Sequence, residues 1–221
     1  MQGGSYADYV PVAAADVAAK PEQLSMIEAA AVPLTALTAW QALADHMHLQ
    51  PGQTVLIHAG AGGVGSFAIP IAKYLGATVL TTASTANADY VRGLGADMVI
   101  DYRNQDWAVA VRQHCPDGVD AVLDSLGGAA SLQSLALIRR DGVMVCLNAP
   151  VEDDVAASHG VRCQRLFVTP DGAGLRRIAN LIDIGVLPLP PVRSLPLAEA
   201  AQAFGLSKAG HVRGKLVLDL A

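Results

Sequence analysis

Four glycines stand within six residues of one short stretch, HAGAGGVGSF at 58–67. Glycine inside a structured segment costs conformational entropy, so a cluster this dense indicates that something approaches the backbone closely. Gly60, Gly62 and Gly65 fit the pattern G-x-G-x-x-G. In that pattern the first glycine permits a tight turn, the second admits a pyrophosphate, and the third lets helix pack on strand. The stretch predicts a dinucleotide site; the alternative is a tight strand-to-helix turn that binds no ligand.

The residues after the next predicted strand bear on which dinucleotide is bound. NAD sites place an Asp or Glu there to hold the ribose 2′-hydroxyl. Here the sequence reads TASTAN at 82–87, with Ser84 and Thr85 as hydroxyl donors and no carboxylate. Tyr102 and Arg103, after the third predicted strand, could flank the adenine and add positive charge. The pattern favours NADP(H), although the two hydroxyls could equally cap the next helix.

An alternation of strands and helices must position these residues. Short β-branched runs alternate with stretches whose apolar residues recur at helical spacing. Repeated strand–helix–strand units predict an α/β fold, a doubly wound parallel Rossmann sheet with helices on both faces. The predicted strands are 54–58, 78–82, 98–100, 119–123, 143–147 and 166–168, and the predicted helices are 66–75, 87–94, 107–114, 130–138 and 175–184.

The two ends of the chain depart from this rhythm. Residues 6–12 read as an extended piece that is followed by Ala-rich sequence. The other end opens with a proline-punctuated connector, then a helix at 198–208 and a final strand at 216–220. We interpret these ends as pieces of a second, mainly β domain. The predicted division is 1–30 for a remnant of that domain, 31–186 for the Rossmann domain and 187–221 for a return to the second domain.

Composition and charge argue against several classes of partner. The chain is 52% hydrophobic and 16% charged, which is enough apolar content for a packed core. A net charge of −5 with scattered basic residues argues against nucleic acid or an anionic membrane surface. No apolar run is long enough to span a bilayer, and the first residues lack a signal-peptide pattern. We therefore expect a cytoplasmic protein with no membrane partner and with free cysteine thiols.

Other residues that could do chemistry are better explained as structural. His46 and His48 could suggest a metal, but HMHLQPG is typical of an exposed helix end, and we expect no metal site. Ser125, in DSLGG, does not stand in the G-x-S-x-G pattern of a hydrolase nucleophile. His58 could contact a phosphate, but a buried structural role is favoured. Cys146 is expected in the core.

Seven stretches together carry a family resemblance that spans essentially the whole chain. They are GGSYADYVPV (3–12), AAAVPLTALTAWQAL (29–43), LIHAGAGGVGSFAIPIAKYLGA (56–77), LGADMVIDYR (94–103), GVDAVLDSLGG (118–128), FVTPDG (167–172) and GHVRGKLVL (210–218). The chain resembles the medium-chain dehydrogenase/reductase superfamily, in its zinc-independent quinone oxidoreductase (zeta-crystallin-like) branch. The resemblance implies that the two ends belong to a GroES-like catalytic domain. In the family, a long β-rich amino-terminal segment forms most of that domain, and this sequence starts near the end of that segment.

The resemblance also implies a set of cofactor-binding residues. The expected set is Thr38 at the nicotinamide end; Gly60, Gly62, Gly63, Val64 and Gly65 around the pyrophosphate; Ser84, Thr85 and Tyr102 at the adenosine ribose and its 2′-phosphate; Leu147 and Asn148 where the cofactor crosses the sheet; Phe167 and Val168 beside the nicotinamide; and Lys215. A lysine that the family often has shortly after the serine is Ala88 here. No residue offers itself as a catalytic acid or base, so the proton is expected from solvent.

The function that the resemblance implies is NADPH-dependent hydride transfer to a quinone or an activated alkene, with a small electrophilic molecule as the partner. Two alternatives remain open: a non-catalytic module that binds NADP(H), and a zinc-independent alcohol dehydrogenase. Members of the family commonly join their sheets edge to edge. A homodimer is therefore expected, with the strand at 143–147 or 166–168 as the contacting edge.

Overall fold

Six parallel strands form the central sheet of the computed structural model, which describes residues 4–7, 9–210 and 212–220. The strand order is β3-β2-β1-β4-β5-β6. This is the doubly wound α/β arrangement that the sequence predicts, and the order reverses between β1 and β4. The strands are β1 (Thr54–Ile57), β2 (Thr78–Ala83), β3 (Met98–Asp101), β4 (Val119–Asp124), β5 (Ile138–Cys146) and β6 (Arg162–Arg165).

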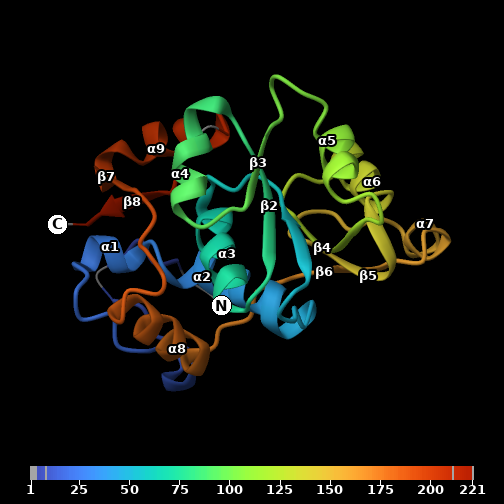
Figure 1. Ribbon diagram of the computed structural model, residues 1–221. Helices are drawn as coiled ribbons and strands as arrows, with labels where there is room; N and C mark the ends of the chain where they lie inside the picture. The colour runs from blue at the N-terminus through green and yellow to red at the C-terminus, as the bar shows by residue number, and fades with distance from the viewer. Residues whose placement is uncertain (1–3, 8, 211, 221) are drawn as a thin grey trace.

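Helices cover both faces of this sheet, because successive side chains of a strand point to opposite faces. On β1, Val55 and Ile57 pack into one hydrophobic core and Leu56 into the other. In Figure 1, α5 and α6 lie on the side of the sheet away from α3 and α8. The first core is covered by α2 (Pro33–Trp40), α3 (Gly63–Tyr74), α4 (Ala88–Gly93) and α8 (Gly172–Asp183), and the second by α5 (Trp107–His114), α6 (Ala129–Leu135) and α7 (Asp153–Ser158).

Helix α3 begins three residues earlier than the predicted 66–75, at Gly63. Its N-cap is Gly62, whose backbone is extended (φ −76°, ψ 175°), so the glycine pattern itself forms the first turn of the helix. Gly76 follows the helix with a φ of +83° and ends it as a C′ glycine should. Pro70 lies within the helix and is buried.

A second, two-stranded parallel sheet pairs β7 (Val192–Pro196) with β8 (Lys215–Asp219), and α9 (Ala200–Lys208) connects them. Figure 1 shows this unit beside α1 (Met26–Ala30) and α4, outside the six-stranded sheet. The domain boundaries at 30/31 and 186/187 stay a prediction. Within the described residues, every helix is too short or too polar to cross a membrane.

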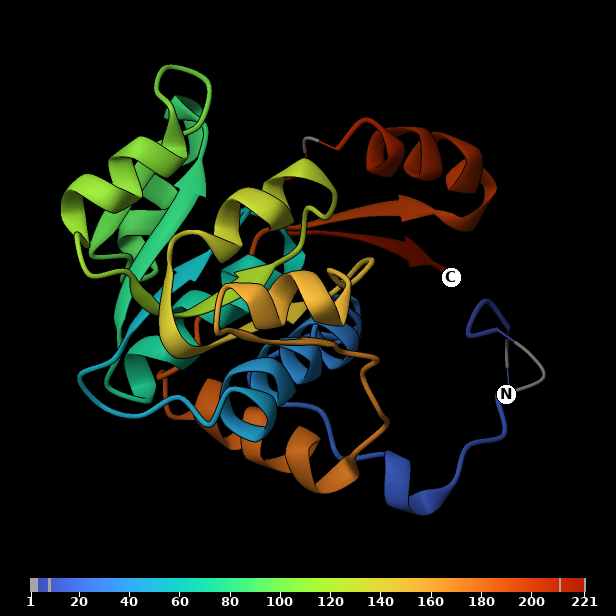
Figure 2. The same cartoon turned by 90° about the vertical axis from the view of Figure 1, so that its right-hand side faces the viewer.

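The extended piece expected at 6–12 is not a strand in the part that the structure describes, 6–7 and 9–12. A strand needs a neighbour to satisfy its backbone groups, and no described strand lies alongside. Figure 2 shows this amino-terminal segment running along the outside of the molecule, and its Tyr6 lines a groove together with Leu216 and Leu218 of β8.

The strand predicted at 166–168 is also wrong: the sixth strand is β6, which ends at Arg165. The apolar run LFV suggested a buried strand, but only Leu166 is buried, and Phe167 is 68% exposed. Beyond Cys146, the last residue of β5, no partner strand continues. A strand at a sheet edge can carry charged residues, because one side of it faces solvent.

The predicted edge at 143–147 is wrong as well, since β5 pairs with β4 on one side and β6 on the other. The edges of the sheet are β3 and β6. The homodimer itself stays a prediction.

Candidate functional site

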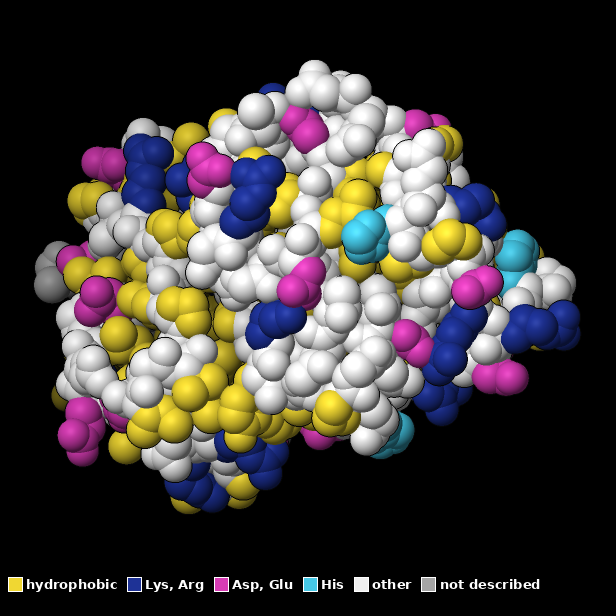
Figure 3. Space-filling model, in the orientation of Figure 1, with side chains coloured by type: hydrophobic (Ala, Val, Ile, Leu, Met, Phe, Trp, Pro, Cys, Tyr) yellow, Lys and Arg dark blue, Asp and Glu magenta, His cyan; other side chains and the backbone are white. Residues whose placement is uncertain are grey.

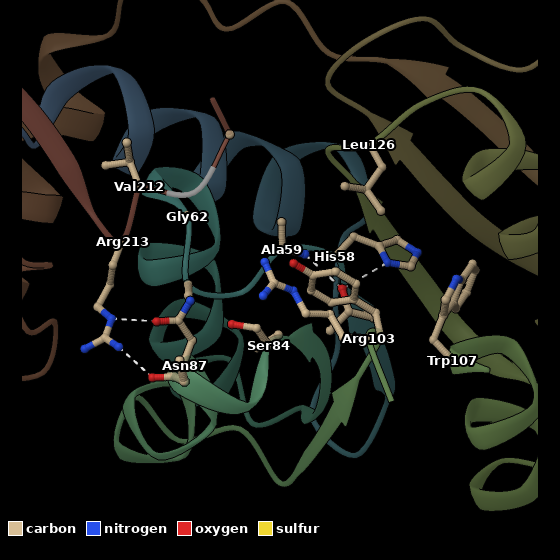
Figure 4. A pocket seen from close by; sticks show the side chains of 16 residues that line it. His58, Ala59, Gly62, Ser84, Asn87, Arg103, Trp107, Leu126, Val212 and Arg213 are labelled. Carbon is tan, nitrogen blue, oxygen red and sulfur yellow. Dashed lines mark hydrogen bonds between the residues drawn. The ribbon is translucent and has the colours of Figure 1, made fainter. Parts of the chain in front are cut away.

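A pocket of about 680 Å³ opens at the carboxyl ends of β1, β2, β3 and β4 (Figure 4). It lies beside the point where the strand order reverses, which is where open α/β sheets bind ligands. The glycine-rich loop and the segment before β8 lie side by side in the wall, where the Gly214 amide donates to the Ala61 carbonyl (3.0 Å). The lining residues are His58, Ala59, Ala61, Gly62, Thr82, Ala83, Ser84, Ala86, Asn87, Tyr102, Arg103, Trp107, Leu126, Gly210, Val212 and Arg213.

At two glycines of the loop, the surrounding atoms leave room for a hydrogen atom but not for a Cβ. A Cβ at Gly60 would overlap the hydroxyl of Thr81, and a Cβ at Gly65 would lie 2.5 Å from the carbonyl oxygen of Ala59. Gly62 is less crowded, with that same oxygen at 3.3 Å, and it lines the pocket. The first glycine therefore closes the turn against β2, the third lets α3 pack against the loop, and the second leaves the backbone open to a ligand.

The start of α3 offers amides that have no partner among the described residues. Its first hydrogen bond runs from the Ser66 amide to the Gly62 carbonyl (2.9 Å), which leaves the three preceding amides free. Lys215 lies beside them in a smaller cleft with Gly63 and Val64. Burial lowers the pKa of the Lys215 ammonium. Free amides, the helix dipole and a nearby ammonium together make an anion site.

Strand β2 holds the loop in a conformation that is unusual for its residue type. Ala59 has a φ of +53°, in the left-handed region that L-residues seldom adopt. Its amide donates to Thr82 Oγ1 (3.0 Å), and the amide of Gly60 donates to the Thr82 carbonyl (3.0 Å). Its carbonyl accepts from the amide of Gly62 (2.9 Å). These bonds keep a strained turn in place, as is common where a backbone is shaped to receive a ligand.

His58 fills the wall of the pocket behind this turn and is 1% exposed. Its Nε2 lies 2.9 Å from Ser134 Oγ, whose own proton is donated to the Ala130 carbonyl (2.8 Å). Nε2 must therefore carry the ring proton, and Nδ1 accepts from the Thr82 hydroxyl (3.3 Å). Burial lowers the pKa of His58 to about 4. The neutral ring meets Trp107 edge-on at 4.7 Å, so the favoured structural role agrees with its contacts.

A buried carboxylate organises the turn after β4. Asp124 Oδ1 accepts from the amides of Leu126 (2.8 Å) and Gly127 (3.2 Å), and Oδ2 accepts from the Ser131 hydroxyl (2.5 Å). Asp124 has no exposed surface, so its charge is compensated by these donors. The turn places Leu126 on the pocket wall, facing His58 and Trp107 in Figure 4.

The ends of β2 and β3 form the polar end of the pocket. Ser84, Tyr102 and Arg103 line it, but Thr85 does not. The Thr85 hydroxyl donates to the carboxylate of Asp101, at the end of β3. This hydrogen bond and one from the Arg103 amide lower the pKa of the Asp101 carboxyl. The structure therefore brings Ser84, Tyr102 and Arg103 together in the pocket lining, as predicted. Thr85 does not join them, because its hydroxyl is bonded to Asp101.

Sequence reasoning missed one charged residue of the pocket, Arg213. It precedes β8, and its guanidinium reaches the loop after β2, where it bonds to Asn87 and to the carbonyl of Ala86 (Figure 4). Arg213 stands in the stretch GHVRGKLVL, in which the family resemblance drew attention to Lys215 instead. No local pattern could have found it, because only the folded chain brings this segment to β2.

The residues expected at the nicotinamide end and at the sheet crossing do not line this pocket. Thr38 is buried within α2, and its hydroxyl donates to the Leu34 carbonyl (2.6 Å). Asn148 donates to the Ser125 carbonyl (2.7 Å) and so ties the loop after β5 to the turn after β4. These side chains are engaged with their own neighbours.

The hydrophobic members of that set are divided between core and surface. Leu147 and Val168 pack against the first core. Phe167 faces solvent, and the guanidinium of Arg165 stacks on its ring at 4.1 Å from the centroid. An exposed aromatic ring therefore marks the carboxyl end of β6.

The residues present do not fit a zinc site. Among the residues that the structure describes, no three His, Cys, Asp or Glu side chains are close enough to share a metal ion. His46 and His48 stand at the end of the π-helical segment Gln41–His46 and just beyond it.

Comparisons with known proteins agree with this geometry. A family model described as zinc-binding dehydrogenase matches residues 94–218. The chain is 39% identical over 222 residues to the spectinabilin polyketide synthase system protein NorB of Streptomyces orinoci, covering 95% of this chain and 10% of that protein. It is 33% identical over 221 residues to the chloroplastic NADPH-dependent alkenal/one oxidoreductase of Arabidopsis thaliana, covering 98% of this chain and 53% of that protein.

Among solved structures, the quinone oxidoreductase from Coxiella burnetii superposes with a TM-score of 0.83 at 36% identity, over 91% of this chain and 63% of that one. The chain thus spans about half the length of the plant oxidoreductase and less than two thirds of the bacterial one. It belongs to the zinc-binding dehydrogenase family, among the quinone oxidoreductase-like and alkenal reductase-like members of the medium-chain dehydrogenase/reductase superfamily.

Proposed function

We propose that this chain binds NADPH and supports hydride transfer to an activated alkene or a quinone. The observation that carries the proposal is the pocket at the carboxyl ends of β1 to β4. It joins a glycine-rich loop to two arginines, and its lining contains no Asp or Glu. Glycine backbone and free helix amides suit a pyrophosphate. The missing carboxylate suits a 2′-phosphate better than a ribose 2′-hydroxyl.

Bound NADPH would supply the hydride, and the residues of this chain would bind and orient it. The first amides of α3 would hold the pyrophosphate, with the ammonium of Lys215 nearby. Trp107 and Leu126 offer apolar surface for the adenine, and Ser84 offers a hydroxyl at the ribose. Holding the cofactor by its adenosine end fixes where the other end can lie, which is how positioning lowers a barrier.

The acceptor is proposed to approach the carboxyl ends of β5 and β6. A dinucleotide that binds across the reversal of strand order extends from β2 and β3 toward these strands. The exposed ring of Phe167 offers the kind of flat apolar face on which a conjugated alkene or quinone packs. The likeness to an alkenal/one oxidoreductase supports the alkene. Solvent is the proposed proton source.

The test is oxidation of NADPH by the purified chain, followed by absorbance, with an enone and a quinone as separate acceptors. Turnover that exceeds the rate without protein, and that favours NADPH over NADH, is the expected result. Binding of NADPH with no turnover on either acceptor would sink the reductase and favour the binding module. Reduction of NADP⁺ by alcohols, together with no oxidation of NADPH by enones, would favour the alcohol dehydrogenase.

The homodimer is proposed to use β6, the edge strand next to the acceptor side of the sheet. Both Arg162 and Arg165 are exposed on this strand, so two-fold pairing would bring like charges together. Screening weakens such repulsion, and the dimer should therefore form more readily at high salt than at low salt. Light scattering that gives a monomer at every salt concentration would rule it out.

A further inference from the structure

Two cysteine thiols lie against each other where β5 and β6 run side by side (Figure 1). The Sγ atoms of Cys146 and Cys163 are 3.6 Å apart, close enough for one thiol to donate a hydrogen bond to the other. In the register of the sheet, Cys163 stands opposite Met144, two residues before Cys146 on β5. Alternate residues of a strand share a face, so all three side chains pack into the second core. The sheet therefore aims the two sulfurs at each other.

The two thiols differ in exposure and in acidity. Cys146 is fully buried, whereas Cys163 is half-buried. The hydrogen bond from the Cys146 thiol lowers the pKa of Cys163 to about 7, and the same bond raises the pKa of Cys146. Burial and the carboxylates of Asp124 and Asp153 oppose the lowering of the Cys163 pKa, and the amide of Val151 supports it. The sulfur that solvent can reach is therefore the one that carries the thiolate, which is the reactive form.

Strand β6 can supply the movement that a bond between these sulfurs needs. A disulfide holds its sulfurs about 2 Å apart, so the two atoms must approach by about 1.5 Å. Strand β6 has four residues and is bonded to β5 alone, and an element with few neighbours opens more easily than a central one. The amide of Leu166 donates to the carbonyl of Cys146 (2.9 Å), so movement here reaches the segment that carries Phe167.

The remaining cysteine provides an internal comparison. Cys115 is also free and half-buried, and it packs against the same core. Burial raises the pKa of Cys115, and the carboxylate of Asp120 raises it further. At neutral pH its thiolate is therefore scarce, although its exposure resembles that of Cys163.

We propose that Cys163 and Cys146 form a site of reversible oxidation, at which hydrogen peroxide converts the thiol pair into a disulfide that joins β6 to β5. The site is independent of the proposed reductase. The Cys163 thiolate attacks one peroxide oxygen; an S–O bond forms, the O–O bond breaks, and the departing hydroxide takes up a proton and leaves as water. Cys146 then attacks the sulfenic sulfur; the S–S bond forms, the S–O bond breaks, and a second water leaves with the Cys146 proton. Two thiols are oxidised by two electrons, and one peroxide is reduced to two waters.

Mass spectrometry of the folded, unaltered chain tests the pairing. The chain is treated with one equivalent of peroxide at pH 7, blocked with iodoacetamide and digested. The expected product has lost about 2 Da, the mass of two hydrogens, and contains one cross-linked peptide pair through Cys146 and Cys163, with the alkyl label on Cys115. Dithiothreitol should restore three labelled cysteines. Without peroxide, brief labelling at pH 7 should modify Cys163 about tenfold faster than Cys115.

Three variants assign the two sulfurs their parts. Cys146→Ala removes the second thiol, so peroxide should leave Cys163 as a sulfenic acid, with a gain of about 16 Da that dimedone traps. Cys163→Ser removes the attacking sulfur and should leave Cys146 unoxidised. Cys115→Ser is the matched control and should form the same disulfide as the unaltered chain.

Several results on the unaltered chain would overturn the proposal, and none of them depends on whether a variant folds. Three labelled cysteines after peroxide would show that the pair is only packed together. Sulfinic acid at Cys163 beside a free Cys146 would show that the second sulfur cannot reach the first. A disulfide between two chains, or one that includes Cys115, would place the oxidation elsewhere.

Discussion

At the carboxyl ends of β1, β2 and β3, segments from distant parts of the chain enclose a pocket. At the carboxyl ends of β5 and β6, by contrast, Asn148 and Phe167 are exposed to solvent. The first region has a glycine loop, a buried histidine network and a wall supplied by Arg213. In the second region, Asn148 is held by the neighbouring turn and Phe167 faces solvent. Both regions carry residues that the family resemblance assigned to one cofactor.

From this difference we propose that cofactor affinity and turnover are separable in this fold. The turns of the proposed adenosine side are fixed by buried hydrogen bonds, and we expect this side to recognise half of a dinucleotide by itself. The proposed acceptor side presents exposed groups, such as the ring of Phe167. Changes on the adenosine side should therefore alter folding and cofactor affinity, and changes on the acceptor side should alter turnover alone.

Figure 3 adds a third surface to this comparison. Hydrophobic side chains gather over α1 and the β7–β8 sheet, on the left of that view. A groove of about 750 Å³ there is lined mainly by apolar residues, among them Leu34, Phe204 and Leu218. It shares Ser207, Lys215 and Leu216 with the cleft at the start of α3.

The largest effect is expected at the third glycine of the loop. Gly65→Ala places a methyl group against the backbone of Ala59 and Gly60, which cannot move without opening the turn. The free energy of unfolding should fall by about 3 kcal/mol, measured by urea denaturation, with loss of NADPH binding. Gly205→Ala is the matched control: it also lies in a helix but meets nothing within 4 Å, and it should stabilise by about 0.5–1 kcal/mol. Equal free energies of unfolding for Gly65→Ala and Gly205→Ala would show that the crowding around Gly65 does not fix the turn.

The buried histidine network should make stability depend on pH. The pKa of His58 is about 4 in the folded chain against 6.5 for an ordinary histidine, so the unfolded chain takes up the proton first as pH falls. The stability that neutral His58 contributes is complete above about pH 6.5 and is lost as pH falls toward 4.

Between pH 7 and pH 5 this loss should amount to about 2 kcal/mol, measured by urea denaturation at each pH. His58→Asn, which cannot take up a proton, should flatten that dependence. His114→Asn changes an exposed histidine and should leave the dependence as it is. An unaltered slope in His58→Asn would show that other groups cause it.

A carboxylate at the end of β2 should reverse the cofactor preference. Ser84→Asp puts a negative charge where the 2′-phosphate is proposed to bind and offers an acceptor to a ribose 2′-hydroxyl. Affinity for NADPH should fall by about tenfold, and affinity for NADH should rise, both measured by calorimetry. Ser84→Asn has nearly the same shape without the charge and should leave NADH affinity unchanged. Retention of NADPH preference in Ser84→Asp would place the phosphate elsewhere.

The smallest effect on stability is expected on the acceptor side. Phe167→Ala removes an exposed ring and should change the free energy of unfolding by no more than about 0.5 kcal/mol, with NADPH affinity intact. Turnover on an enone should fall, because the acceptor loses its proposed packing surface. Phe204→Ala, an equally exposed phenylalanine on α9, should leave turnover unchanged. Weaker NADPH binding in Phe167→Ala but not in Phe204→Ala would show that the adenosine side and the acceptor side are coupled.

Local patterns predicted much of the fold. The strand-to-helix rhythm, the glycine loop and the C′ glycine at Gly76 were readable because each depends on near neighbours in sequence. The edge strand was not readable: β6 carries Arg162 and Arg165, and the apolar run beyond it suggested the strand instead. Hydrophobic pattern identifies a strand through its burial, and an edge strand is buried only in part.

The sequence by itself determined the βα order and the tight turn of Gly60 to Gly65, because these follow from backbone sterics and from apolar periodicity. Only the tertiary structure decided which polar side chains share a site. It directed Thr85 to Asp101 and away from the pocket, and it carried Arg213 to the end of β2. Those outcomes depend on distances between segments far apart in sequence, and such distances are fixed only when the sheet assembles and its helices pack.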